Sequence, residues 1–157
     1  MGVSAVAEGA QAIERLQSRF PDAVLEQGSF RGQHWAVVPA SRWLEIARWL
    51  RDEPENDFNV LADITAVHWP HRNPPMEIVA HLYSHSRNDY LRLKTRVGDT
   101  GPVDSLTALW RSADWNEREA FDMFGIEFAG HPDLRRILMP EDYTDFPLRK
   151  ELPLYRG

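Results

Sequence analysis

The chain contains no cysteine among its 157 residues. This absence excludes disulfides, thiolate nucleophiles, and thiolate ligands to zinc or to an iron–sulfur cluster. An excess of basic residues is also missing, because 24 acidic residues outnumber 18 basic ones and give a formal net charge of -6. Such a charge provides no overall attraction to nucleic acid or to an anionic membrane surface.

Long apolar runs and the common catalytic signatures are missing too. No run approaches the roughly 18 apolar residues that a membrane-spanning helix requires, and the N-terminal residues lack the basic flank and apolar core of a signal peptide. The sequence has no phosphate-binding glycine loop and no nucleophile elbow. We therefore expect a soluble, cytoplasmic chain, and its length favours a single domain.

Apolar spacing along the chain predicts a succession of helices and strands. Apolar residues three and four positions apart, as at Ile13 and Leu16, predict an amphipathic helix that ends before Pro21. Ser41 is expected to cap the next helix. Short apolar runs separated by turns predict a hairpin and then an antiparallel meander. The expected helices cover residues 7–20, 43–53, 105–110 and 116–126, and the expected strands cover residues 23–27, 35–38, 58–67, 76–84 and 90–97.

The order of these elements predicts the fold class and the domain organisation. The order α-β-β-α-β-β-β-α indicates a two-layer α+β protein in which helices pack on one mixed, mostly antiparallel sheet of about five strands. We expect this domain to cover residues 1–130. Residues 131–157 are expected to form an extended C-terminal docking tail of the same domain, because prolines interrupt this apolar segment at positions 132, 140, 147 and 153. Such a tail must lie against its own domain or against a partner.

The helix expected at residues 116–126 is rich in charge. Asp114 or Asn116 is expected to cap its start, and Gly125 suits a left-handed exit. A helical wheel separates a packing face from a charged face: Ala120, Phe121 and Phe124 lie on the first, and Trp115, Arg118, Glu119 and Asp122 lie on the second.

Two interpretations of this charged face are open. Glu119 and Asp122 are three residues apart, a spacing that suits a metal site or an acid–base pair. The alternative is a solvated face on which Arg118 pairs with Asp122. This second interpretation is favoured, since the sequence offers no convincing third ligand beyond His131.

Two further patterns lie on the expected strands. His81 and His85 point to the same side of one strand, but their Cα atoms are about 13 Å apart, which is too far for one metal ion. Arg92, Lys94 and Arg96 alternate with apolar residues and form a basic stripe, which would suit RNA. A solvated or protein-facing sheet surface is favoured over RNA, because no glycine-aromatic signature accompanies the stripe.

The C-terminal half resembles a known family. The motifs are E-R-E-x-x-D-M-F-G-I at residues 117–126, H-P-x-L-x-R-I-L-M-P-E-D at residues 131–142, and P-L-R-K before an acid, leucine and proline at residues 147–153. In their order and spacing they resemble the 30 kDa subunit of respiratory complex I and its counterpart in the chloroplast NADH dehydrogenase-like complex. Upstream, LADITAVHWP at residues 61–70 is similar to the central strand of that family.

The resemblance implies a structural role without cofactors in this chain. Members of the family bind no flavin, cluster or quinone of their own. They lie beside the 49 kDa subunit and the subunit that holds the terminal iron–sulfur cluster, while FMN and the iron–sulfur clusters belong to partner subunits. The charged residues are then docking groups, with ion pairs inside the chain as the alternative for each. The candidates for the partner interface are Glu117, Arg118, Glu119, Asp122, His131, Arg135, Arg136, Arg149 and Lys150.

The resulting prediction is a non-catalytic subunit of the peripheral arm of a proton-pumping NADH:quinone oxidoreductase. It would lie on the cytoplasmic side of the inner membrane, held there by its partners, and position the quinone-proximal module. Two alternatives stay open. One is the equivalent subunit of a related membrane-bound hydrogenase or ferredoxin-dependent complex, and the other is an RNA-binding module built on the basic stripe.

Overall fold

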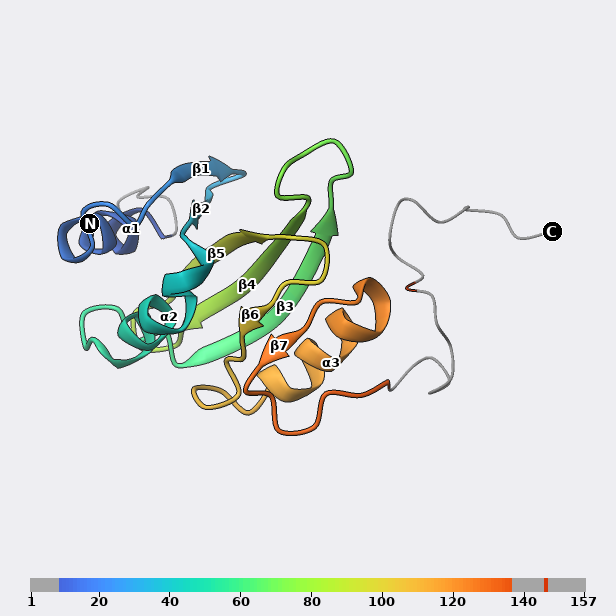
Figure 1. Ribbon diagram of the computed structural model, residues 1–157. Coiled ribbons are helices and arrows are strands. Elements are labelled where there is room, and N and C mark those ends of the chain that lie inside the picture. The colour runs from blue at the N-terminus through green and yellow to red at the C-terminus, as the bar shows by residue number, and fades with distance from the viewer. Residues whose placement is uncertain (1–8, 137–145, 147–157) are drawn as a thin grey trace.

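The computed structural model describes residues 9–136 and residue 146. Its main feature is a five-stranded sheet in the order β1-β2-β5-β4-β3 (Figure 1). All neighbouring strands are antiparallel except β2 and β5, which are parallel. The predicted mixed, mostly antiparallel sheet is therefore confirmed. Its strands are β1 (Glu26–Phe30), β2 (Gln33–Val37), β3 (Val60–His68), β4 (Met76–Ser84) and β5 (Asp89–Val97).

The helices are α1 (Ala10–Arg19), α2 (Trp43–Asp52) and α3 (Ala113–Phe124), with a short 3-10 turn at Ala40–Arg42 before α2. A second, two-stranded sheet pairs β6 (Val103–Asp104) with β7 (Phe128–Ala129) in parallel. The order of the main elements is thus the predicted α-β-β-α-β-β-β-α. None of the helices in the described part of the chain is long and apolar enough to cross a membrane.

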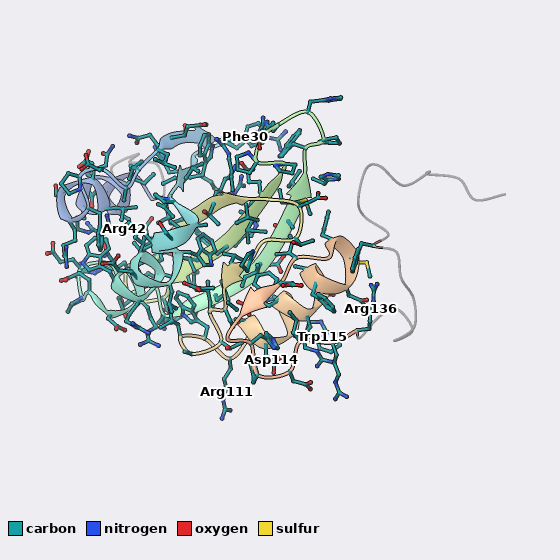
Figure 2. All side chains as sticks on the ribbon, viewed as in Figure 1. Phe30, Arg42, Arg111, Asp114, Trp115 and Arg136 are labelled. Atoms are coloured by element: carbon teal, nitrogen blue, oxygen red, sulfur yellow. The ribbon has the colours of Figure 1, made fainter. Side chains whose placement is uncertain are left out.

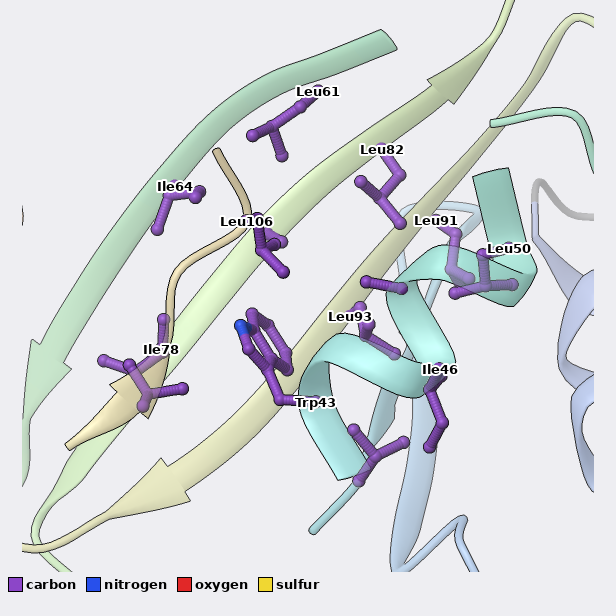
Figure 3. Packing of buried hydrophobic residues seen from close by; sticks show 14 of the residues in the cluster. Trp43, Ile46, Leu50, Leu61, Ile64, Ile78, Leu82, Leu91, Leu93 and Leu106 are labelled. Atoms are coloured by element: carbon purple, nitrogen blue, oxygen red, sulfur yellow. The ribbon is translucent and has the colours of Figure 1, made fainter. Parts of the chain in front are cut away.

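The core lies between the helices and one face of the sheet. Along β5 the apolar residues are buried in alternation, because successive side chains of a strand point to opposite faces. Figure 3 shows Leu93 beside Trp43 and Leu91 beside Leu50, both of α2, and the same core cluster includes Ile78 of β4 and Ile64 of β3. All of these side chains are buried, so hydrophobic burial fixes which face of the sheet the helices cover.

Several local predictions were wrong. Ser41 does not cap α2, because residues 40–42 form a 3-10 turn and the cap position is Arg42. Residues 105–110 form hydrogen-bonded turns, not a helix. The backbone N–H of Leu106 in this segment donates a hydrogen bond to α3. The first strand begins at Glu26 and not at residue 23, whereas the hairpin turn at Arg31 and Gly32, both with positive φ, lies between the two predicted strands.

The strand expected at the centre of the sheet is at its edge. β3 carries the D-x-T-A-V sequence, and it is the last strand in the order, paired only with β4 within the described residues. Its register shifts between Leu61 and Asp63. Because edge strands keep one side unpaired, this position brings β3 into contact with α3 rather than with a sixth strand. Figure 1 shows α3 beside β3.

Candidate docking surface

Helix α3 is held by backbone contacts at both ends. The Ser112 hydroxyl does not cap the helix but donates a hydrogen bond to the carbonyl of Leu61 on β3 (2.8 Å), which ties the start of α3 to the sheet edge. The predicted caps Asp114 and Asn116 lie inside the helix. The helix ends as predicted at Gly125, which has a φ of 81° and donates its N–H to the carbonyl of Phe121 (2.8 Å).

Glu117 is a fully buried carboxylate with partners in its own chain. It accepts hydrogen bonds from the Ser105 hydroxyl (2.6 Å) and from the backbone N–H of Leu106 (2.7 Å). Burial raises the pKa of Glu117 to about 7, with a smaller contribution from the negative charge of Asp114, although the two hydrogen bonds oppose this rise. These two hydrogen bonds connect the turn after β6 to the first half of α3.

Asp122 is also fully buried, whereas the helical wheel predicted it to be exposed. Its partner is Arg136, whose Nη1 donates to the carboxylate (2.9 Å) and also to the backbone carbonyl of Asp122. The predicted pair of Asp122 with Arg118 is replaced by this pair, in which the two side chains are 0% and 7% exposed. A low-dielectric environment makes the pair costly to break, because one charge would be left buried alone.

Arg136 connects this ion pair to an aromatic cluster. Its guanidinium lies over the ring of Phe146 (4.5 Å to the centroid) and near that of Phe121 (5.9 Å). The two rings meet edge to face at 6.2 Å. Phe146 also packs on Gly125, where a Cβ atom would come within 2.7 Å of the ring. Glycine is therefore required here both for its φ and for its lack of a side chain.

His131 joins the next segment to the start of α3. Its Nδ1 accepts the backbone N–H of Asp133 (3.0 Å), so the neutral ring carries its proton on Nε2. Nε2 then donates to Asp114, whose carbonyl and carboxylate oxygens are 3.1 and 3.2 Å away. The side chain of His131 is completely covered. Like Glu117 and Asp122, His131 thus forms hydrogen bonds within its own chain.

Of the remaining described candidates, Arg135 is exposed and Arg118 is half-buried. Arg118 lies near the ring of Trp115 (5.9 Å), which is 52% exposed. The Nε atom of Arg118 is buried and has no hydrogen-bond partner within the described part of the chain. Arg135 pairs with the exposed Asp133 (3.1 Å). Figure 2 shows Trp115 and Arg136 on the same side of the molecule. The candidates Arg149 and Lys150 lie outside the described residues.

Glu119 lines a groove between α3 and the edge strand. The groove has a volume of about 310 Å³, and its lining combines residues of both elements. Those from β3 are Asp63, Ile64, Thr65 and Ala66, and those from α3 are Glu119, Ala120, Met123 and Phe124. The two carboxylates therefore border an otherwise largely apolar groove.

Two of the three cations in the basic stripe on β5 pair with acids of the same chain. Arg96 makes two hydrogen bonds to Glu26 and one to Glu77, and Lys94 lies 3.7 Å from Glu77 and over the ring of Trp35. The hydrogen bonds to the two acids raise the pKa of Arg96 despite its partial burial. These contacts weaken the RNA-binding alternative, because Lys94 and Arg96 already have carboxylate partners and Arg92 donates a hydrogen bond to the side-chain amide oxygen of Gln33.

The structure offers no metal cluster among the residues it describes. No three His, Cys, Asp or Glu side chains there are close enough together to hold a metal ion. His81 is half-buried, and this burial lowers its pKa, with the nearby Asp63 opposing the change. His85 is exposed and packs edge to face against Tyr83 (6.2 Å).

Comparisons with known proteins identify the relatives of this fold. Residues 36–156 match the family model described as the respiratory-chain NADH dehydrogenase 30 Kd subunit. The chain is 47% identical over 94% of its length to the C subunit of the NADH-quinone oxidoreductase of a Roseiflexus species, of which it covers 85%. It is 43% identical over 95% of its length to the corresponding subunit of Citrifermentans bemidjiense, of which it covers 92%.

One solved structure extends the likeness to more distant proteins. A chain of the membrane-bound sulfane sulfur reductase, described as an archaeal respiratory membrane complex, superposes with a TM-score of 0.77. The superposition covers 93% of the present chain and 86% of the other, at 24% sequence identity. At this identity the match establishes a shared fold.

Proposed function

Because the chain belongs to the family of the 30 kDa subunit of complex I, the NADH-quinone oxidoreductase, we propose that it is a structural subunit of a proton-pumping enzyme of this kind. In this proposal it has no active site of its own and positions the quinone-proximal module of the peripheral arm. The observation that carries the proposal is the family match over residues 36–156, which includes all of α3 and the segment after it.

The use of polar residues around α3 supports a structural role. Glu117, Asp122 and His131 have the residue types of a catalytic site, but each forms hydrogen bonds with other parts of the same chain. Their contacts join α3 to the turn after β6 and to the segment that follows the helix, instead of directing reactive atoms into a cavity. We propose that residues 131–157 act as a docking tail that begins from this fixed point.

The proposed partners follow from the same family. We propose contacts with the 49 kDa-type subunit and with the subunit that holds the terminal iron–sulfur cluster. FMN and the clusters would belong to partner subunits, which agrees with the absence of cysteine from this chain. The chain would associate with the cytoplasmic side of the inner membrane through these partners.

A related complex with another electron donor is the second candidate. The same fold occurs in an archaeal complex that is named for sulfane sulfur reduction, so the fold by itself does not specify NADH. The relatives with the higher identities are all named as a C subunit of NADH-quinone oxidoreductase. The NADH-dependent complex is therefore the function that the comparisons favour.

Affinity purification from the native host tests both candidates. The chain would be tagged, the membranes solubilised in a mild detergent, and the eluate assayed for NADH:quinone reductase activity and iron–sulfur absorbance. We expect an active, iron-containing multisubunit complex. Iron without NADH oxidation would support a complex with another donor, and a chain that copurifies with no partner under several mild detergents would contradict the proposed function.

A further inference from the structure

We propose that the groove between β3 and α3 binds a segment of a partner subunit that carries a lysine or arginine next to a large apolar side chain. This inference rests on the proposed function, since it names the chemistry of one partner contact. It also assigns a specific role to Asp63 and Glu119, the two acids that border the groove.

The position of the groove makes it accessible to another chain. It lies at the last strand of the sheet, where no strand of the described residues pairs with the outer side of β3. Its strand side spans residues 63–66, a length of about 10 Å, which matches three to four residues of an extended segment. The register shift just before Asp63 is the kind of irregularity that redirects a side chain at a sheet edge.

The floor of the groove suits an apolar side chain. Ile64 and Ala120 are buried, and Ala66, Met123 and Phe124 are partly buried around them. A volume of about 310 Å³ accommodates one large side chain together with its backbone. Methionine adapts its shape to a ligand more readily than branched residues do, because its side chain is flexible.

The border of the groove suits a cation. Among the described residues, no hydrogen bond or ion pair involves the carboxylate of Asp63 or of Glu119. His81 faces Asp63 across the strand pair, but burial lowers the pKa of His81 and so disfavours its charged form. The nearest arginine on α3, Arg118, lies over Trp115 instead. Arg92 lines a neighbouring hollow with Asp63 and His81, but it donates its hydrogen bond to Gln33. Neither carboxylate therefore has an ion-pair partner among the described residues, and a basic side chain between them would form charge-assisted hydrogen bonds.

Charge reversal in the assembled complex tests the inference. The variant would be Asp63→Lys with Glu119→Lys, and the matched control would be Glu14→Lys with Glu127→Lys, which changes two exposed acids outside the groove. We expect the groove variant to reduce copurified partner subunits by roughly tenfold or more, and the control to leave the yield unchanged. Thermal unfolding of each purified chain would establish that both variants fold.

Neutral substitutions separate the charge from the shape of the groove. Asp63→Asn with Glu119→Gln keeps both side-chain volumes, so we expect a smaller loss of partner than with the lysine variant. The remaining association should also depend less on salt, because the ion pairs would be absent. If the neutral variant or the lysine variant retained as much partner as the control, the inference would be wrong.

A photocrosslinker at Met123 identifies what occupies the groove. In the intact complex, we expect a benzoylphenylalanine at this position to join to a partner-subunit peptide that contains lysine or arginine. A cross-link within this chain, to a peptide without a basic residue, or to no protein would each overturn the inference. Should the wild-type chain copurify with no partner at all, the proposed function itself would fail.

Discussion

Ion pairs occur both around α3 and on the face of the sheet that the helices do not cover, but the two sets of pairs differ in burial. Around α3, Asp122 and Arg136 are almost completely covered and form a close pair. On the sheet, Glu26 and Arg96 form a two-bond pair whose side chains are 50% and 26% exposed. Water screens the second pair and not the first, so similar chemistry is expected to contribute very differently to stability. Four substitutions test this contrast, from the largest expected effect to the smallest.

Replacing Arg136 should produce the largest loss of stability. Arg136→Ala leaves the Asp122 carboxylate buried without its cation and removes the contact with Phe146. We expect the free energy of unfolding in urea to fall by about 3–5 kcal/mol. Arg135→Ala is the matched control, since Arg135 is exposed, and it should change the value by less than about 0.5 kcal/mol. Equal changes in the free energy of unfolding would show that the Asp122–Arg136 pair contributes no more to stability than an exposed ion pair does.

Glu117 should make stability depend on pH. Its pKa is about 7 in the folded chain and about 4.5 in the unfolded chain. The folded state therefore holds the proton more tightly between these values, so stability decreases as the pH rises from 4.5 to 7 and is constant above. We expect the wild type to lose about 3 kcal/mol relative to Glu117→Gln across this range, measured by urea unfolding at a series of pH values. A difference that does not change with pH would contradict the raised pKa.

The exit of α3 offers a matched pair of glycines. Gly125 and Gly130 both have positive φ, at 81° and 86°, but a Cβ atom would meet the Phe146 ring at Gly125 and nothing within 4 Å at Gly130. Gly130→Ala should cost about 1 kcal/mol for the backbone conformation alone. Gly125→Ala should cost about 2 kcal/mol, because the ring must also move. If thermal unfolding gave the same cost for both, Phe146 would not be packed on Gly125 in solution.

The smallest effect is expected on the open sheet face. The hydrogen bonds and charge of Arg96 lower the pKa of Glu26, so its contribution to stability is present at neutral pH and is lost as the pH falls through that lowered pKa. We expect Glu26→Gln to reduce the unfolding temperature only slightly at low salt and not measurably in 1 M salt. A loss that persists in high salt would mean that this pair behaves like the buried one.

The sequence predicted the framework of the molecule with few errors. The strand at residues 76–84 was predicted with its correct limits, and the strand at residues 90–97 missed only one residue. The first is a nearly continuous buried run and the second alternates apolar with charged residues, so both signals are local in the sequence. The left-handed exit at Gly125 was predicted for the same local reason. By contrast, the wheel placed Asp122 on an exposed face, because it contains no information about a segment fourteen residues later.

The groove and the hydrogen bonds of Glu117 could not be found by spacing. Ser105 is twelve residues from Glu117, and the intervening turn was predicted to be a helix. Asp63 and Glu119 are distant in sequence and meet only because β3 is the edge strand. The motif that contains Glu119 indicated a family and a docking role, but it did not indicate which acids point outward.

The sequence by itself determined the order of helices and strands, the absence of thiolate chemistry, and the family to which the chain belongs. These properties depend on composition, on the periodicity of neighbouring residues, and on motifs that are continuous in the chain. Only the tertiary structure decided which charged residues are buried and which remain open to a partner. The physical reason is that burial and ion pairing depend on elements far apart in sequence, which come together when the apolar faces of the helices and the sheet pack.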